Sequence, residues 1–350
     1  MTNPIDDRVH ADGTNDGVRA DGDGETESLT LVESIRDTLH SEMAADEDII
    51  LLGEDIGKTG GVFRATEGLY DEYGRERVVD TPISELGIVG TSIGLAASGL
   101  RPVAEIQFMG FSYDAVGQLF HRAARINTRT RGKYNCQMVV RIPFGGGIRS
   151  PDLHGESMEA AFAHHPGLKV IAPSTPYDAK GLLISAIYDP DPVLFLEPKK
   201  IYRAFREDVP TESYRVPLGE AAVRREGSDV SVFTWGAMTR PTLAAAESAA
   251  EDGIDAEIVD LRSISPLDRT AIVESFKKTG RAVVVHEAPK TGGLAGEITS
   301  IIQENALLYQ EAPIERVTGF DTVYPLYDLE DYQLPNRARI EKGIRETVEF

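Results

Sequence analysis

Cysteine is almost absent from this 350-residue chain, which contains only Cys136. A single cysteine excludes an internal disulfide and any metal site built from a cysteine cluster, and it is typical of a reducing compartment. Long apolar runs are missing too, because the longest uncharged stretch, residues 86–100, is shorter than the roughly 20 residues of a membrane-spanning helix. The N-terminus is acidic and does not resemble a secretory signal. We therefore expect a cytoplasmic protein that does not bind a membrane.

Basic residues, and lysines above all, are scarce. The chain has 36 Lys and Arg residues, of which 10 are lysine, against 57 Asp and Glu residues, which gives a net charge of -21. Nucleic-acid phosphates need a basic surface, so we expect no nucleic-acid binding. We interpret the excess of carboxylates as the adaptation of a halophile to a salt-rich cytoplasm, where screening weakens their repulsion.

The sequence divides into a tail, two α/β units and a linker. Residues 1–27 are acidic and nearly free of large apolar side chains, which predicts a disordered tail. In residues 28–200 and again in 218–350, short apolar runs alternate with helical segments, which predicts two doubly wound α/β domains with mainly parallel sheets. Residues 201–217 are polar and contain prolines, and we interpret them as a linker.

The predicted strands and helices follow from these runs. Strands are expected over 49–53, 77–79, 102–108, 138–144, 168–172 and 193–197, and then over 229–235, 256–261, 281–286 and 314–319. One long helix is expected over 112–131, and a capping box of Thr30 and Glu33 marks the start of the first helix.

Glu85 stands out as the only charged residue between positions 81 and 100. Pro82 disfavours a helix before it and Ser84 can cap one after it, so Glu85 is expected where a strand passes into a buried helix. A carboxylate there is either a capping group neutralised by the helix dipole or a site residue that shares a proton with a ligand. Position alone favours the capping interpretation.

Two further groups are candidates for chemistry. His154 lies in a polar loop after a predicted strand, where α/β sheets place ligand sites, so it is either a general acid or base or a solvated loop residue. Phe108, Phe111 and Tyr113 follow another strand end and form either a platform for a planar ring or part of the core.

Taken together, these motifs resemble the β subunit of the thiamine-diphosphate-dependent decarboxylating component of 2-oxoacid dehydrogenase complexes. The matching blocks run in order from about residue 29 to the C-terminus: GEDIG (53–57), DTPISELG (80–87), AEIQF (104–108), LHGES (153–157), HHPGLKVIAPSTPYDAKGLL (164–183), DPVLFLEPK (191–199), VDLRSISPLD (259–268) and HEAPKTGGLAGEI (286–298). The resemblance implies a transketolase-like pyrimidine-binding domain over 28–200 and a transketolase C-terminal-like domain over 218–350. It also implies oxidative decarboxylation of a 2-oxoacid, such as pyruvate or a branched-chain 2-oxoacid, with acyl transfer to lipoamide.

The resemblance assigns roles to particular residues. Glu85 matches the glutamate that hydrogen-bonds the pyrimidine ring nitrogen of the cofactor. Phe111 and Gln107 match positions that line the pyrimidine. His154 matches the histidine that faces the substrate and assists proton transfer when the acyl group passes to lipoamide.

The resemblance further implies a structural potassium site. Its ligands would be the carbonyl oxygens of Met138, Ala186 and Ile187, together with Asp189 and Asp191, since oxygen ligands suit such a cation.

The diphosphate and Mg²⁺ ligands of the family are not found in this sequence. The string Gly22–Gly24 resembles the start of that motif, but no Asn-Asn pair follows it, and we reject it. The resemblance implies that these groups come from an α subunit in an α2β2 heterotetramer, so that the chain alone is inactive. It also implies that the C-terminal domain docks the lipoyl acyltransferase core.

Two alternatives remain. A fragment of a transketolase or deoxyxylulose-phosphate synthase would share both domains, but its diphosphate domain would lie upstream, where we expect only the tail. A non-catalytic docking subunit would not need Glu85 and His154. The sequence does not identify the 2-oxoacid, because candidate substrates differ by methylenes worth about 0.8 kcal/mol each.

Overall fold

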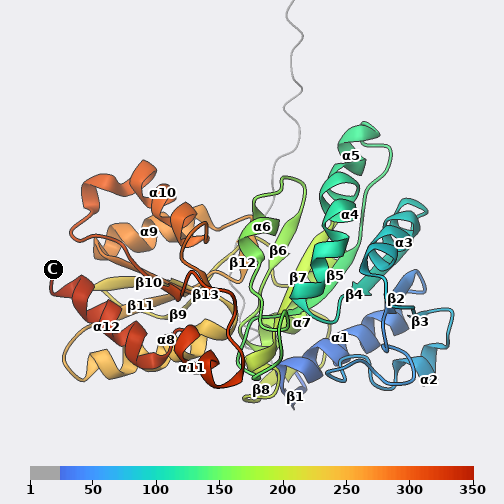
Figure 1. Cartoon of the computed structure of the whole chain (residues 1–350), viewed down its shortest axis with the longest axis horizontal. Helices are drawn as coiled ribbons and strands as arrows, with labels where there is room; N and C mark the ends of the chain where they lie inside the picture. Colours follow the sequence, from blue (N-terminus) through green and yellow to red (C-terminus); the bar gives the residue numbers. More distant parts are fainter. Residues whose placement is uncertain (1–23) are drawn as a thin grey trace, which may run out of the picture.

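The computed structural model describes residues 24–350, so most of the predicted tail lies outside the described residues. Two mainly parallel β-sheets, each flanked by helices, lie side by side (Figure 1). We call the units built on them the first and the second domain. The predicted α/β class is confirmed. Among residues 24–350, no helix is both long enough and apolar enough to cross a bilayer.

The first domain is built on a sheet with the strand order β12-β6-β7-β5-β4-β2-β3. Its strands are β2 (Ile49–Gly53), β3 (Val78–Asp80), β4 (Arg101–Glu105), β5 (Val139–Phe144), β6 (Lys169–Ile171), β7 (Val193–Pro198) and β12 (Ser263–Ser265). All but β12 pair in parallel, and every residue of β5 and β7 is buried. Burial on both faces accounts for their continuous apolar runs.

Helices pack on both faces of this sheet. They are α1 (Leu31–Ala45), α2 (Leu69–Tyr73), α3 (Glu85–Ala97), α4 (Val116–His121), α5 (Ile126–Arg129), α6 (Glu159–Ala163) and α7 (Pro176–Ile187). Neighbouring residues of β5 point to opposite faces, so Val139 joins the apolar cluster of α1 and α7, and Val140 joins that of α3 and α4. The predicted capping box starts α1, where the Thr30 amide donates to Glu33 Oε2 at 2.8 Å.

The prediction of a single helix over 112–131 is wrong. This segment forms two short 3₁₀ turns, η1 (Met109–Ala115) and η2 (Ala123–Arg125), which alternate with α4 and α5. The chain packs here against the residues that follow α6: a Cβ on Gly167 would lie 2.2 Å from the Ala124 carbonyl oxygen, and Phe120 stacks on His165. Tertiary packing therefore overrides the helical pattern.

The second domain has a five-stranded sheet in the order β14-β13-β10-β11-β9. Its strands are β9 (Ala222–Arg225), β10 (Val230–Thr234), β11 (Ala256–Asp260), β13 (Ala282–Pro289) and β14 (Glu315–Gly319), of which β9 alone is antiparallel. The helices of this domain are α8 (Thr239–Ala250), α9 (Arg269–Thr279), α10 (Ala295–Ala306), α11 (Glu330–Gln333) and α12 (Arg337–Val348), and short 3₁₀ turns lie beside them.

Several short strands were not predicted. β1 (Thr26–Leu29) begins at the end of the segment expected to be a tail, and it pairs antiparallel with β8 (Glu207–Pro210), which lies in the segment expected to be a linker. β12 follows the second-domain strand β11 along the chain but pairs antiparallel with β6 in the first-domain sheet. The two domains therefore share backbone hydrogen bonds.

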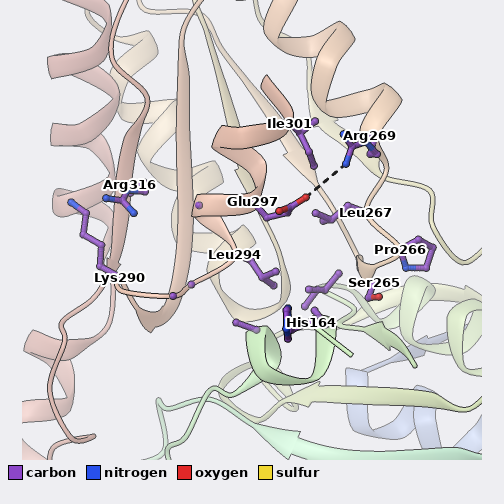
Figure 2. A pocket seen from close by; sticks show the side chains of 16 residues that line it. His164, Ser265, Pro266, Leu267, Arg269, Lys290, Leu294, Glu297, Ile301 and Arg316 are labelled. Atoms are coloured by element: carbon purple, nitrogen blue, oxygen red, sulfur yellow. Dashed lines mark ion pairs between the residues drawn. The ribbon is translucent and has the colours of Figure 1, made fainter. Parts of the chain in front are cut away.

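A cavity of about 610 Å³ lies between the domains. Figure 2 shows Lys290 and Arg316 together at one end, the ion pair of Arg269 with Glu297 at the other, and His164, just after α6, on the first-domain side. None of the predicted site residues lines this cavity.

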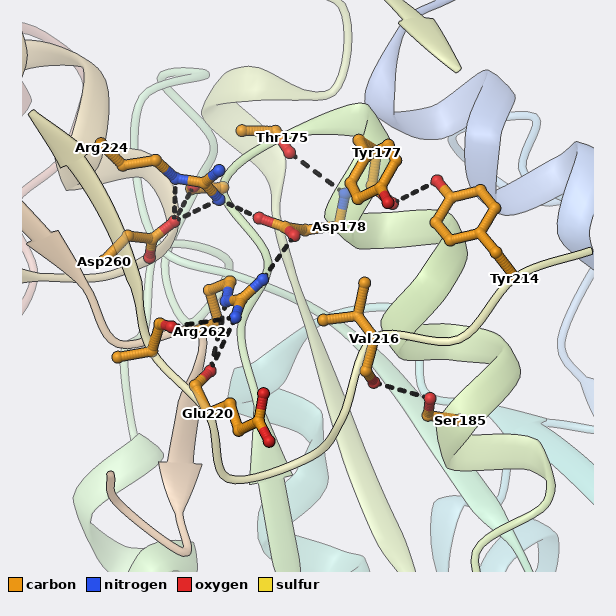
Figure 3. Close-up of polar contacts among 12 residues, drawn as sticks. Thr175, Tyr177, Asp178, Ser185, Tyr214, Val216, Glu220, Arg224, Asp260 and Arg262 are labelled. Atoms are coloured by element: carbon orange, nitrogen blue, oxygen red, sulfur yellow. Dashed lines mark hydrogen bonds and ion pairs between the residues drawn. The ribbon is translucent and has the colours of Figure 1, made fainter. Parts of the chain in front are cut away.

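A buried group of charged residues holds the domains together elsewhere (Figure 3). Asp178 on α7 of the first domain accepts from Arg262 at 2.9 Å and is also paired with Arg224. Arg224 in turn contacts Asp260 at 2.9 Å, and Asp260 accepts from Ser174 of the first domain. Each buried charge thus has an opposite partner, which burial requires.

Candidate active site

Six parallel strands of the first sheet end at the same edge, and the segments after five of them carry the residues considered below. From one side to the other these five strands are β7, β5, β4, β2 and β3. The segments that follow them therefore gather along one line, where α/β sheets bind ligands. The residues of interest that follow these strands are, in the same order, Lys199, the loop with His154, Gln107, Glu54 and Glu85.

A cavity of about 470 Å³ opens at this edge. The structure brings the three predicted cofactor-contacting residues together in its wall. Its lining residues are Glu54, Ile83, Glu85, Gln107, Gly110, Phe111, Tyr113, Asp114 and Leu153.

Glu85 occupies the first position of α3 and is 9% exposed. The capping hydrogen bond of this helix belongs to the neighbouring residue, because the Gly87 amide donates to Ser84 Oγ at 3.2 Å. The position at a helix N-terminus stabilises a negative charge. Glu85 is therefore a buried carboxylate in the cavity wall and not the cap itself.

Glu54 is a second carboxylate of this cavity that the sequence analysis missed. It follows β2 directly, and burial, with the nearby charges of Glu85 and Asp55, raises the pKa of Glu54. Its Oε1 is buried and has no hydrogen-bond partner among residues 24–350. Gln107 Nε2 donates to the Glu54 backbone carbonyl at 3.4 Å. The signal that could have identified Glu54 is its place immediately after a buried strand.

His154 lies against the aromatic side of the cavity. Its ring is 4.3 Å from the ring centre of Phe108 and 5.1 Å from that of Phe111. Nδ1 lies 2.7 Å from the Asp152 carbonyl oxygen, which can only accept, so Nδ1 carries the proton in this contact. Nε2 then keeps its lone pair, and the imidazole can take up a proton at that atom.

A buried ion cluster supports the sheet edge. Arg141 on β5 donates to Glu105 at 2.8 Å and to Glu197 at 2.6 Å and 3.1 Å, so one guanidinium joins three adjacent strands. The Tyr202 hydroxyl also donates to Glu197. This cluster fixes the relative positions of β4, β5 and β7, whose ends carry site residues.

These residues fit the ring of a planar heteroaromatic cofactor. Phe111 offers an aromatic face, Gln107 offers an amide, and the unpartnered Glu54 oxygen and the Glu85 carboxylate offer hydrogen-bond acceptors. The pyrimidine of thiamine diphosphate has the amino group and ring nitrogens that such an edge can bind. No cluster of basic residues lines the same cavity, so its described wall does not fit a diphosphate.

The five predicted potassium ligands belong to segments at the opposite edge of the sheet, where the carbonyl oxygens of Met138 and Ile187 already accept hydrogen bonds from Val193 N at 3.0 Å and from Gln137 Nε2 at 3.1 Å. Met138 precedes β5, and Ala186 and Ile187 end α7, whose last carbonyls carry the negative end of the helix dipole. Their surroundings already contain a cation: Lys169 Nζ lies 2.6 Å from Asp189 and 3.4 Å from Asp191. Among residues 24–350, no group of three or more His, Cys, Asp or Glu side chains could hold a metal ion.

Comparisons with known proteins cover nearly the whole described chain. Residues 27–204 match the family described as transketolase, pyrimidine binding domain, and residues 219–340 match the transketolase C-terminal domain. The pyruvate dehydrogenase E1 component subunit β of Bacillus subtilis is 49% identical over 322 residues, which is 92% of this chain and 99% of that protein. The proteins of the same name from Staphylococcus epidermidis and Staphylococcus aureus are each 47% identical over 322 residues, with the same coverage.

A solved structure shares the fold. It is described as a split gene transketolase, an inactive β4 tetramer, and it matches with a TM-score of 0.75 at 22% identity over 92% of this chain and 99% of that chain. At this identity the likeness concerns the fold alone.

Proposed function

This chain belongs to the family of 2-oxoacid dehydrogenase E1 component β subunits, and we propose that its substrate is pyruvate and that it works in an α2β2 heterotetramer. The names of the relatives support pyruvate over branched-chain 2-oxoacids. The family works with an α subunit and with thiamine diphosphate. We further propose a cytoplasmic complex in which the second domain docks the lipoyl acyltransferase core.

The observation that carries this proposal is the cavity at the sheet edge. It combines two carboxylates, Glu54 and Glu85, with the aromatic ring of Phe111, and His154 lies against the same ring. Its rim is apolar and open: Ile83 is 83% exposed and Tyr113 is 53% exposed. Exposed apolar side chains beside a site suit a partner subunit that covers them and supplies the diphosphate and Mg²⁺ ligands.

Each residue then has a defined task. Thiamine diphosphate, when bound, supplies the nucleophilic carbon and the electron sink for loss of carbon dioxide. When the cofactor is bound, Glu85 would hydrogen-bond the pyrimidine ring nitrogen, Phe111 would pack on the ring and Gln107 would contact its edge. Burial and the nearby charges of Glu85 and Asp55 raise the pKa of Glu54, so two negative charges face each other less readily in this cavity than they would in water. His154 transfers a proton at Nε2 when the acyl group passes to lipoamide.

Two proposals concern ions. A potassium ion held by Met138, Ala186, Ile187, Asp189 and Asp191 would neutralise the end of α7 and the two carboxylates, which already face the ammonium of Lys169. The net charge of -21 supports a halophilic origin, in which salt screens the surface carboxylates.

The test is to purify the chain alone and together with its α subunit. Thiamine diphosphate binding and decarboxylation of pyruvate, 2-oxoisovalerate and 2-oxobutyrate are then measured with an artificial electron acceptor. We expect turnover only in the two-subunit sample, with pyruvate as the best substrate. Robust turnover by the chain alone would contradict the heterotetramer, and a higher kcat/KM for 2-oxoisovalerate would contradict the choice of pyruvate.

A further inference from the structure

The loop between β5 and α6 carries His154 but contains no regular secondary structure that would hold it in place. It starts with Gly145 and Gly147, whose φ angles of +77° and +97° are strained for other residues. Such a backbone is held mainly by contacts with its surroundings. Several of the contacts that hold this loop come from the second domain.

Two carboxylates of the second domain accept hydrogen bonds from the loop backbone. Glu287 on β13 accepts from the Gly146 amide at 2.8 Å. Glu330 on α11 accepts from the Arg149 amide at 3.0 Å and, through its other oxygen, from the Tyr324 hydroxyl at 2.8 Å. Both carboxylates are buried, so these bonds are protected from water.

The ring of Tyr324 lies between the two arms of the loop. A Cβ on Gly146 would be 1.7 Å from Tyr324 Oη, and a Cβ on Gly155 would be 2.1 Å from Tyr324 Cε1. Gly155 directly follows His154, so the tyrosine ring packs against the backbone beside the imidazole. The two glycines provide the space that this ring occupies.

Lys199 completes the arrangement from the first domain. Its buried ammonium donates to the backbone carbonyl of His154 itself and lies 5.3 Å from the ring centre of Phe108, over which the imidazole also packs. The charges of Glu287 and Glu330 balance this ammonium, although burial still lowers the pKa of Lys199 to about 8. The lysine thus adds a first-domain contact to the residue that the loop presents.

We propose that Glu287, Tyr324, Glu330 and Lys199 form a clamp that positions His154 for acyl transfer to lipoamide. These are positioning residues, because they act through the loop. The inference rests on the role of His154 given under the proposed function. It assigns to the second domain a task in the active site, which lies on the first.

The experiment compares two activities of the reconstituted heterotetramer: acyl transfer to lipoamide, and decarboxylation with an artificial electron acceptor. We expect Tyr324→Ala to lower the first about tenfold and to leave the second within about twofold, because the loop is released while the ring-binding wall is untouched. Tyr324→Phe keeps the ring between the glycines and should recover most of the loss. Glu330→Gln should resemble Tyr324→Ala.

Tyr332→Phe is the matched control, because this tyrosine is in the neighbouring helix α11 but is 72% exposed, and both activities should be normal. Equal loss of both activities in the clamp variants, or no loss in either, would overturn the clamp. If Tyr324→Ala does not fold, Glu330→Gln decides in the same way, because it removes a carboxylate that accepts from the loop backbone. His154→Ala separates the two proposals: normal acyl transfer in this variant would overturn the role of His154, whereas impaired transfer with a normal Tyr324→Ala enzyme would overturn the clamp alone.

Discussion

The pH dependence of stability should be governed in part by Glu159, which begins α6. Its carboxyl group is buried, and neither oxygen has a hydrogen-bond partner among residues 24–350. Burial raises the pKa of Glu159 to about 7, from 4.5 in the unfolded chain. Between these two values the unfolded chain has lost the proton while the folded chain keeps it, so stability falls as the pH rises.

The size of the effect follows from the difference in pKa. A shift from 4.5 to about 7 corresponds to roughly 3 kcal/mol of stability, which is lost by about pH 8 and largely retained at about pH 5. Glu159→Gln removes the ionisation and keeps the shape. We expect this variant to be more stable than the parent by roughly 3 kcal/mol at about pH 8 and by only about 1 kcal/mol at about pH 5.

Urea unfolding of the full chain at both pH values measures this difference. Glu247→Gln, at an exposed position on α8, is the control and should change stability by less than about 0.5 kcal/mol at either pH. An equal effect of Glu159→Gln at both pH values, or a loss of stability at about pH 8, would show that the ionised carboxylate has a stabilising partner and that burial is not its main influence.

Three other predictions concern activity, the core and the surface. Glu85→Gln should lower turnover of the heterotetramer about 10²-fold or more while its mass by light scattering is unchanged, and normal turnover would show that the carboxylate is dispensable. Arg141→Met should cost about 3–5 kcal/mol in urea unfolding, because it leaves Glu105 and Glu197 buried without a cation, and a cost below about 1 kcal/mol would refute this. Raising KCl from about 0.1 M to about 2 M should raise the melting temperature, and an unchanged value would contradict halophilic adaptation.

Much of the fold follows from local sequence. Buried parallel strands are continuous apolar runs, and all ten runs interpreted as strands form strands in the structure, within a few residues of the predicted ends. The strands that were missed are short and lie in polar sequence. β12, for example, has only three residues and pairs with β6, about 90 positions earlier, so no local pattern could reveal its partner.

The positions of the candidate site residues could be predicted to the extent that strand ends identify them. Glu85, Gln107 and Phe111 follow strands and do line one cavity. Glu54 and Lys199 also follow strands, but only the three-dimensional arrangement shows that Glu54 faces Glu85 and that Lys199 reaches the carbonyl of His154. The contribution of Tyr324 could not be predicted, because it depends on a contact between segments about 170 positions apart.

The division of the chain into two domains therefore does not coincide with a division of tasks. The first domain supplies the cavity, but its sheet includes β12, whose residues follow the second-domain strand β11 along the chain. Asp178 binds two arginines of the second domain, and the loop with His154 rests on Glu287 and Glu330. Because all three contacts involve buried groups, separating the domains would expose unpaired charges and free the loop in one step. We infer that the two domains fold into one unit and that the geometry of the active site depends on both.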